Sequence, residues 1–245
     1  MVTQLLFGEC YEVLESGEKW LLIRNLHDHY QCWIDAKQHH SIDAEIANKL
    51  LKNPQKRCGD AIGQLRNSAN QVFAIPCASL LPAYHEGFIQ VEEQKYAFDG
   101  RVARHDSDSI IRHARRLLHA PYLWGGKSVF GIDCSGLVQV ICACAGIYLP
   151  RDAWQQAEFG DAVDFVDLLQ KGDILFFDNE EGRIHHVGIA MGEGKIIHAS
   201  GSVRIDLIDH QGIYVASTGK YTHKLRLIRR YNPGHYLPEP RQSVE

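Results

Sequence analysis

The sequence predicts an α+β fold in which small all-β units are followed by an antiparallel sheet packed with a cysteine-bearing helix. Short apolar runs at residues 172–177, 187–191 and 195–199 are separated by turns that contain Asn and Gly, which is typical of an antiparallel meander. Upstream of them, apolar residues recur at helical spacing from Cys134, and Gly146 supplies a stop. These patterns define the second half of the chain.

The N-terminal half is expected to begin with a small β-barrel over residues 1–41. Its short strands are separated by turn signals at Gly8, at Ser16-Gly17 and from Asn25 to His29, and they cover residues 2–7, 10–14, 20–23 and 31–35. A linker over residues 42–56 follows. Ser41 can cap a helix that runs to about Leu51, and Pro54 closes it.

A second all-β unit is predicted over residues 57–105. Apolar pieces at residues 71–75 and 88–91, with turns at Gly87 and Asp99-Gly100, suit another small barrel packed on the first.

The third unit covers residues 106–232 and opens with a helix. Asp106 or Ser107 can start this helix, and Pro121 ends it. Residues 233–245 are expected to form a loose or surface-draped tail.

Cys134 is the leading candidate for a reactive group because it begins the predicted helix. Unpaired backbone N–H groups and the positive end of the helix dipole favour a thiolate there, so a thiol with a pKa of about 8.5 in water can ionise near neutrality. Asp133 is expected to cap the helix, and the Gly-rich approach at residues 122–126 lets backbone come close to a ligand. The remaining cysteines are expected to be buried apolar residues: Cys10, Cys32, Cys58, Cys77, Cys142 and Cys144.

Two histidines of the meander are expected to share one face of the sheet. A three-residue turn at residues 192–194 pairs Met191 with Lys195, which sets His198 opposite Gly188. His198 is then one diagonal step from His186, roughly 7–8 Å between backbone positions, where two imidazole rings can hydrogen-bond. A two-residue turn would put the rings on opposite faces.

The order cysteine, histidine, histidine is that of a cysteine hydrolase. His186 can take the proton of Cys134, and His198 can orient His186 in place of the more familiar carboxylate. The alternative for His198 is a strand histidine whose nitrogens are satisfied by backbone. His185 points to the other face of its strand and is expected to be a surface or packing residue.

Four ordered motifs resemble those of the NlpC/P60 cysteine peptidases. They are Pro121-Tyr122-Leu123-Trp124-Gly125-Gly126, Asp133-Cys134-Ser135-Gly136, His186-Val187-Gly188-Ile189 and Ile197-His198-Ala199-Ser200. Within that family the chain is similar, over nearly its whole length, to γ-D-glutamyl-L-diamino acid endopeptidases with N-terminal bacterial SH3-like domains. The resemblance implies a papain-like catalytic domain, with Cys134 as nucleophile, His186 as general base and His198 as third polar member. The second β unit resembles an SH3-like domain only weakly.

The resemblance also implies substrate contacts. Asp133 and Tyr30 would hold the free amine of an L-Ala-γ-D-Glu-diamino acid peptide, and Ser135 and Tyr122 occupy further substrate or active-site positions. Without the resemblance, Tyr30 reads as a core aromatic residue.

Arg151 has two interpretations. Its planar guanidinium can grip a substrate carboxylate, or it can form a surface salt bridge with Asp152 or another neighbour. Relatives often carry Ser where this chain has Ala153, which removes one possible hydroxyl donor to the D-Glu carboxylate.

Relatives have an additional strand and a charged loop before the segment that matches residues 1–4. From this we expect an incomplete first barrel, without the acidic loop residue that helps to hold the substrate amine in relatives. Glu9 and Glu12 are nearby acids but are expected to be solvated strand residues.

Composition narrows the classes of partner. The 245 residues carry a formal net charge of -4, and scattered Lys and Arg predict no basic patch, which disfavours nucleic acid. No apolar run approaches the roughly 20 residues of a membrane span, and residues 1–10 lack the features of a signal peptide. With seven cysteines, an odd number, a reducing cytoplasmic location is expected.

The sequence therefore predicts an endopeptidase that cleaves the γ-D-glutamyl to diamino acid bond of cell-wall-derived peptides and needs no metal or organic cofactor. Two alternatives stay open. One is a cysteine amidase or acyltransferase with the same three residues, and the other is a catalytically weak peptidoglycan-binding module.

Overall fold

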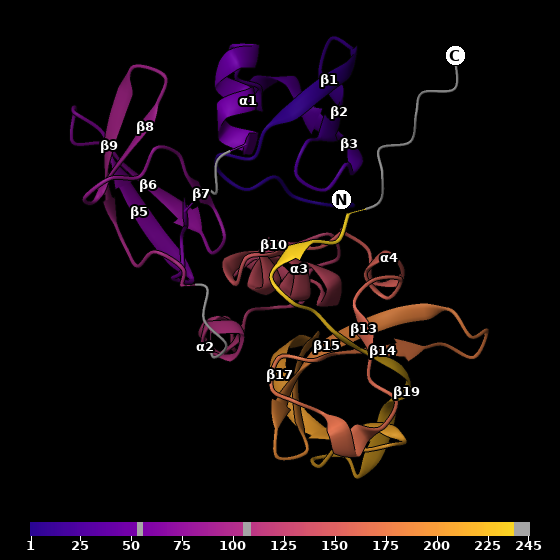
Figure 1. Cartoon of the computed structure of the whole chain (residues 1–245). Helices are drawn as coiled ribbons and strands as arrows, with labels where there is room; N and C mark the ends of the chain where they lie inside the picture. Colours follow the sequence, from indigo (N-terminus) through magenta and orange to yellow (C-terminus); the bar gives the residue numbers. More distant parts are fainter. Residues whose placement is uncertain (53–55, 105–108, 238–245) are drawn as a thin grey trace.

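The computed structural model describes residues 1–52, 56–104 and 109–237. Figure 1 shows two N-terminal β regions on one side of helix α3 and a large sheet on the other. The first region is a three-stranded antiparallel sheet followed by one helix: β1 (Tyr11–Ser16), β2 (Trp20–Asn25), β3 (Gln31–Asp35) and α1 (Ala44–Lys52). Three of the four strands predicted for the first barrel are therefore confirmed.

The strand predicted at residues 2–7 is wrong. This segment has no strand partner and instead runs against the third unit. The N–H of Lys127 donates to Oε1 of Gln4 at 2.7 Å, and Nε of Arg151 donates to Oγ1 of Thr3 at 3.1 Å. Contacts with residues more than 100 positions away replace a β ladder here.

The two helices that connect the units have boundaries that differ from the predicted ones. Helix α1 begins after Asp43, whose Oδ1 accepts a hydrogen bond from the N–H of Glu45 at 2.7 Å, and not after Ser41. Helix α2 (Ser109–Arg116) ends before Pro121. The residues expected to close the first helix and to start the second, Pro54, Asp106 and Ser107, lie outside the described residues.

The second β region contains a four-stranded sheet in the order β6-β5-β9-β8, with a separate β4-β7 pair. Apolar side chains including Leu65, Ile75, Ile89 and Phe98 form its core. The strands predicted at residues 71–75 and 88–91 are confirmed as β6 and β8. The bounds are β4 (Lys56–Arg57), β5 (Ile62–Arg66), β6 (Val72–Pro76), β7 (Leu80–Leu81), β8 (Phe88–Val91) and β9 (Gln94–Asp99).

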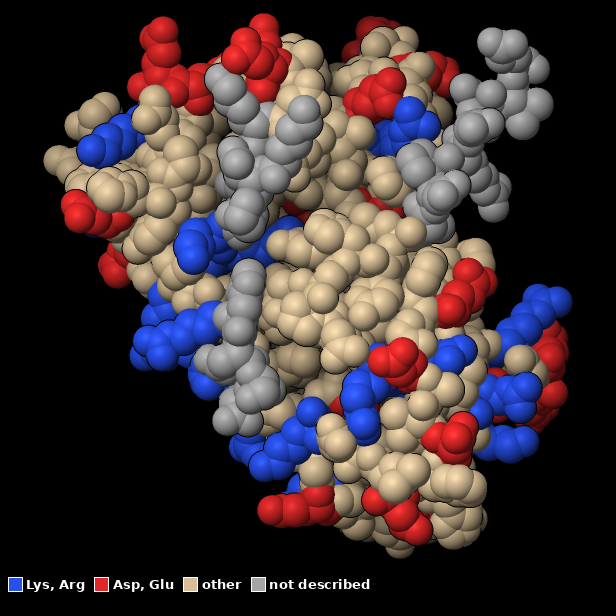
Figure 2. Space-filling view, viewed as in Figure 1, with Lys and Arg blue, Asp and Glu red and all other residues tan. Residues whose placement is uncertain are grey.

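Basic side chains do gather between this region and α2, so the expectation of no basic patch is wrong. A cavity of about 800 Å³ is lined by five of them: Lys56, Arg101, Arg104, Arg112 and Arg116. Figure 2 shows blue side chains concentrated on the side of the molecule beside α2. Asp60 lies 3.9 Å from both Arg101 and Arg116 and offsets part of this charge.

The third unit is built on a seven-stranded antiparallel sheet in the order β13-β19-β14-β15-β16-β17-β18. Because β18 also pairs with β19, six of these strands close on themselves. The bounds are β13 (Asp161–Ala162), β14 (Ile174–Asp178), β15 (Ile184–Gly192), β16 (Lys195–Ser200), β17 (Ser202–Ile208), β18 (Gly212–Val215) and β19 (Lys220–Arg230). The predicted meander is confirmed as β14, β15 and β16.

Helix α3 (Cys134–Cys144) packs against this sheet, and its apolar side chains join those of β15 and β16 in the largest core of the protein. Smaller elements surround it: β10 (Lys127–Ser128), β11 (Gly131–Ile132), β12 (Ile147–Tyr148), α4 (Ala153–Gln156) and two 3-10 turns, η1 (Ala36–Gln38) and η2 (Val166–Leu168).

The β15-β16 hairpin has the predicted register for a different reason. The turn contains two residues, Glu193 and Gly194, with φ of 55° and 63°, and Gly192 pairs with Lys195. Such a turn alone would place the two histidines on opposite faces of the sheet. A bulge at Met191 adds one residue to β15 and so returns them to the same face. His198 therefore lies opposite Gly188, as predicted.

The first residues of the predicted loose tail are part of the fold. Strand β20 (Gly234–His235) pairs in parallel with β12, and the N–H of Tyr236 donates to the carbonyl of Tyr148 at 2.8 Å. Residues 238–245 lie outside the described residues. Within the described part of the chain, no helix has the length and apolar character needed to cross a membrane.

Candidate active site

Cys134 is the first residue of α3, and the predicted cap is confirmed. Oδ1 of Asp133 accepts a hydrogen bond from the N–H of Gly136 at 2.7 Å, while Oδ2 accepts one from the N–H of Gly125 at 2.7 Å. The helix start needs glycine at two places. A Cβ at Gly136 would lie 2.3 Å from the carbonyl oxygen of Gly126, and a Cβ at Gly126 would lie 2.3 Å from the carbonyl oxygen of Gly131. The Gly-rich approach thus packs closely on the helix that begins with Cys134.

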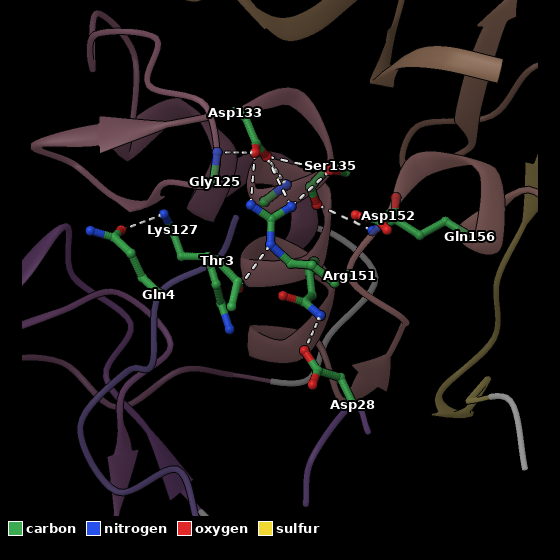
Figure 3. A network of polar contacts seen from close by, with 12 residues as sticks. Thr3, Gln4, Asp28, Gly125, Lys127, Asp133, Ser135, Arg151, Asp152 and Gln156 are labelled. Carbon is green, nitrogen blue, oxygen red and sulfur yellow. Dashed lines mark hydrogen bonds and ion pairs between the residues drawn. The ribbon is translucent and has the colours of Figure 1, made fainter. Parts of the chain in front are cut away.

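The side chain of Arg151 binds Asp133 and Ser135 at this helix start (Figure 3). Its guanidinium donates to Oδ1 of Asp133 at 3.1 Å, to Oδ2 of Asp133 at 2.7 Å and to Oγ of Ser135 at 2.8 Å. The side chains of Arg151 and Asp133 are only 1% and 6% exposed, so this is a buried, bidentate ion pair. Nε of Arg151 reaches Thr3, which ties the N-terminal segment to the site.

Both interpretations of Arg151 from the sequence are therefore wrong. It does not form a surface salt bridge with Asp152, and it does not present an open grip for a substrate carboxylate, because each of its three nitrogens already donates to a protein oxygen. The hydroxyl of Ser135 belongs to the same network and donates to Asp133 at 3.3 Å.

The prediction that Cys134 is ionised near neutral pH is not met, because its surroundings raise the pKa of the thiol. Burial, and then the charge of Asp133, raise the pKa of Cys134 to about 11, although the N–H groups of Val187 and Ser135 act in the opposite direction. Cys134 is 6% exposed. The helix start alone does not outweigh burial, so the resting thiol is neutral and needs a base.

His186 and His198 meet as the shared-face register predicts. Nε2 of His186 lies 2.8 Å from Nδ1 of His198, and their ring planes are nearly perpendicular at 87°. Both side chains are buried. The hydrogen bond between them excludes the alternative in which the ring nitrogens of His198 are satisfied by backbone.

The sequence reading missed Asp206 on β17. Its Oδ2 lies 3.0 Å from Nε2 of His198, so that a carboxylate and two imidazoles form a hydrogen-bonded series. The turn Ser200-Gly201-Ser202 could have revealed it, because pairing Ser200 with Ser202 brings residues 204 and 206 to the same face as His198.

His223 on β19 was missed as well. Its ring stacks on that of His186 with centroids 4.0 Å apart and planes at 25°. His185 is exposed, as expected, and its ring lies 5.9 Å from that of His223 with the planes at 22°. Burial, and then the neighbouring His223, His198 and His185, lower the pKa of His186 well below 6.5. At neutral pH His186 is therefore an unprotonated base.

Two tyrosines predicted from the resemblance lie near the helix start. Burial, followed by the charges of Cys134 and Asp133, raises the pKa of Tyr122 to about 12. Burial and then the charge of Asp152 raise the pKa of Tyr30. The Tyr30 hydroxyl therefore lies near Asp152. Tyr30 is half-buried and directly precedes β3, so it is not a purely internal aromatic residue.

The first β region docks on α3 through polar contacts close to Tyr30. Asp28 accepts from Nε2 of Gln139 on α3 at 2.9 Å, while its other oxygen accepts from the N–H of Tyr30 at 3.0 Å. Glu9 pairs with Lys127 at 3.1 Å, with side chains 6% and 3% exposed. Glu9 is therefore a buried ion-pair partner, in contrast to the solvated residue expected from the sequence.

Residues 119–226 match the NlpC/P60 family, and residues 1–38 match the family described as the bacterial dipeptidyl-peptidase Sh3 domain. Residues 119–226 of the chain belong to the NlpC/P60 family. A crystal structure of an NlpC/P60 family protein from Bacillus cereus superimposes with a TM-score of 0.78 and 25% identity, over 97% of this chain and 82% of that one. The family match covers α3, His186, His198, Asp206 and His223.

Two curated relatives are similar to part of the chain. A γ-D-glutamyl-L-lysine dipeptidyl-peptidase from Bacillus cereus is 37% identical over 52% of this chain and 37% of its own length. A protein of the same name from Bacillus subtilis is 46% identical over 38% of this chain and 32% of its own length. The chain thus spans about a third of these curated relatives.

Chemically, this NlpC/P60 site combines a neutral thiol with a neutral imidazole base. Such a pair attacks an amide carbonyl by moving the thiol proton to the base as the sulfur–carbon bond forms. The N–H groups at the start of α3 can stabilise the resulting oxyanion.

The neutral thiol gives a measurable pH dependence. We expect alkylation of Cys134 by iodoacetamide to speed up about tenfold per pH unit between about pH 7 and pH 9, because the thiolate fraction grows tenfold per unit below the pKa. Peptide-level mass spectrometry after timed labelling measures the rate at each cysteine. A rate that levels off below about pH 8 would show instead a thiol ionised by its surroundings.

Proposed function

We propose that the protein is a cysteine endopeptidase that hydrolyses the γ-D-glutamyl to L-diamino acid bond of cell-wall-derived peptides. The observation that carries this proposal is the hydrogen-bonded series His186, His198 and Asp206 beside a cysteine at a helix N-terminus. The substrate class is supported by the two relatives named γ-D-glutamyl-L-lysine dipeptidyl-peptidase. Lysine and meso-diaminopimelate are the two diamino acids to compare.

The surroundings of Tyr30 support a substrate with a free amino terminus. Three acids, Asp28, Asp133 and Asp152, lie around Tyr30 and Arg151. The pKa of Asp152 is raised, mainly by burial. The negative charge of this group suits an ammonium of the substrate. Asp133 itself already accepts from Arg151, Gly125, Gly136 and Ser135, so we propose that it contributes mainly through its charge.

A direct test incubates the protein with L-Ala-γ-D-Glu-L-Lys and with L-Ala-γ-D-Glu-meso-diaminopimelate and identifies products by mass spectrometry. Release of L-Ala-D-Glu and the free diamino acid supports the proposal. Release of another group would indicate an amidase or acyltransferase, and binding without turnover would indicate a peptidoglycan-binding module; either result rejects the proposal.

We expect Tyr30→Phe to weaken cleavage of free-amine peptides about tenfold or more in kcat/KM, while N-acetylated peptides change little. Loss of one hydrogen bond to a charged group typically costs about 1.5–3 kcal/mol. The same change at exposed Tyr221, whose hydroxyl donates to Asp209, serves as a control. An equal loss on both kinds of peptide would remove Tyr30 from amine recognition.

The expected cytoplasmic location stays a prediction and is part of this proposal. All seven cysteines are free and buried, which is compatible with a reducing compartment. Peptide fragments of the cell wall that enter such a compartment would be the natural substrate pool.

A further inference from the structure

Asp206 is held in a defined orientation by Arg204 and by the register of β17. Arg204 lies directly opposite His198 on β16, and Asp206 is two residues further along the same face. Nη2 of Arg204 donates to Oδ1 of Asp206 at 2.8 Å, and Nε lies 2.6 Å from Oδ2. The Asp206 side chain is 7% exposed, so its charge is only weakly screened by solvent.

An ionised carboxylate accepts hydrogen bonds and donates none, which decides where the proton of His198 lies. Although burial opposes it, hydrogen bonds from His198 and Arg204 lower the pKa of Asp206, so it is ionised at neutral pH. Nε2 of His198 must then carry the proton that it donates to Oδ2. In neutral His198, Nδ1 is left as an acceptor.

The same reasoning continues to His186. Because Nδ1 of His198 accepts, Nε2 of His186 must donate across the 2.8 Å contact. Neutral His186 then has its lone pair on Nδ1, the nitrogen nearer to its own backbone. The N–H of Val187, the residue that follows His186, interacts with the sulfur of Cys134, so the sulfur lies near the backbone of His186.

We propose that Asp206 is a positioning residue that sets the tautomers of both histidines and so makes Nδ1 of His186 the atom that removes the proton of Cys134. This inference rests on the proposed function for its kinetic consequence only. Asp206 touches neither substrate nor sulfur and acts through His198.

The proposed proton path is balanced at each step. The thiol proton moves to Nδ1 of His186 while the sulfur bonds to the amide carbon, and His186 becomes an imidazolium that donates from Nε2 to His198. Nδ1 returns the proton to the leaving amine as the carbon–nitrogen bond breaks. Water then hydrolyses the thioester, and the proton that it gives up through Nδ1 restores the thiol.

The tautomers can be measured directly by NMR on the full-length protein with 15N-labelled histidine. Two-bond 1H–15N correlations distinguish Nδ1–H from Nε2–H rings, and the variants His186→Gln and His198→Gln assign the two sets of signals. We expect Nε2–H for both residues at neutral pH. An Nδ1–H tautomer at either one would overturn the proposal, and the outcome does not depend on any substrate.

The kinetic consequence is tested with D206N. Nη2 of Arg204 donates a hydrogen bond to Oδ1, whereas its Nε makes none to a described residue, so we expect the amide oxygen to stay at the Oδ1 position and the NH2 to face His198. His198 then needs Nδ1–H, which forces Nδ1–H on His186 as well. We expect kcat to fall about 10³–10⁴-fold, as for a wrongly protonated catalytic histidine, with both NMR patterns inverted. Asp167→Asn, an exposed Asp on η2, is the matched control and should leave rate and spectra unchanged.

A D206N protein with unchanged tautomers, or with a rate within about threefold of the parent, would reject the proposal. If D206N does not fold, the spectrum of the parent protein decides alone. If the parent cleaves neither tripeptide, the proposed function fails, whereas the tautomers and the alkylation rate of Cys134 still decide the role of Asp206.

Discussion

Cys134→Ala should abolish hydrolysis of L-Ala-γ-D-Glu-L-Lys, with a loss of about a millionfold in kcat, as expected when a nucleophile is removed from an acyl-transfer site. The N–H groups of Val187 and Ser135 interact with the sulfur at the start of α3. The fold should survive, because alanine is smaller than cysteine and Cys134 is the first residue of α3. Product release followed by mass spectrometry measures the loss.

Cys142→Ala is the matched control, because Cys142 lies on the same helix and is fully buried. It removes the same atom from the apolar core and should leave kcat within a fewfold of the parent. Residual turnover by Cys134→Ala above about one part in a thousand would mean that another group attacks the amide.

Arg151→Ala should lower the free energy of unfolding by about 3–5 kcal/mol, the cost of leaving one partner of a buried ion pair without the other. The change would leave the buried Asp133 carboxylate with only neutral donors, and it would also release Thr3 and Ser135. Denaturant unfolding followed by circular dichroism measures the difference.

The control is Arg183→Ala, which breaks an ion pair with Glu181 of 3.6 Å whose side chains are 81% and 69% exposed. Such pairs contribute between zero and about 1 kcal/mol. A loss from Arg151→Ala no larger than that from Arg183→Ala would show that the network around Asp133 is not a structural support of the helix start.

Local patterns were sufficient to predict the elements that carry the site. The apolar spacing from Cys134 and the Asp133 cap depend on neighbours within a few residues, and both are present in the structure. The pairing of Gly188 with His198 was also predicted, although the turn is shorter than expected and Met191 compensates for it with a bulge. A bulge is decided by the pleat of the whole sheet, which a short sequence window does not contain.

Long-range contacts account for what was missed. Arg151 is read as exposed because nothing near it in sequence reveals that Thr3 and Asp133 enclose it. His223 reaches His186 only because β19 pairs with β14, some 50 residues earlier. Residues 2–7 look like a short strand in sequence, yet the side chains of Thr3 and Gln4 bind to the third unit. Burial of the thiol, which raises the pKa of Cys134, is likewise a property of the packed structure.

Trapping the covalent intermediate tests most directly whether Cys134 is the nucleophile of an amide hydrolase. The protein would be mixed with L-Ala-γ-D-Glu-L-Lys, quenched with acid during turnover and digested for mass spectrometry. We predict an adduct on Cys134 with the mass of L-Ala-D-Glu less one water, absent from Cys134→Ala. Product formation with the adduct on another residue, or with undiminished turnover by Cys134→Ala, would contradict the proposed chemistry.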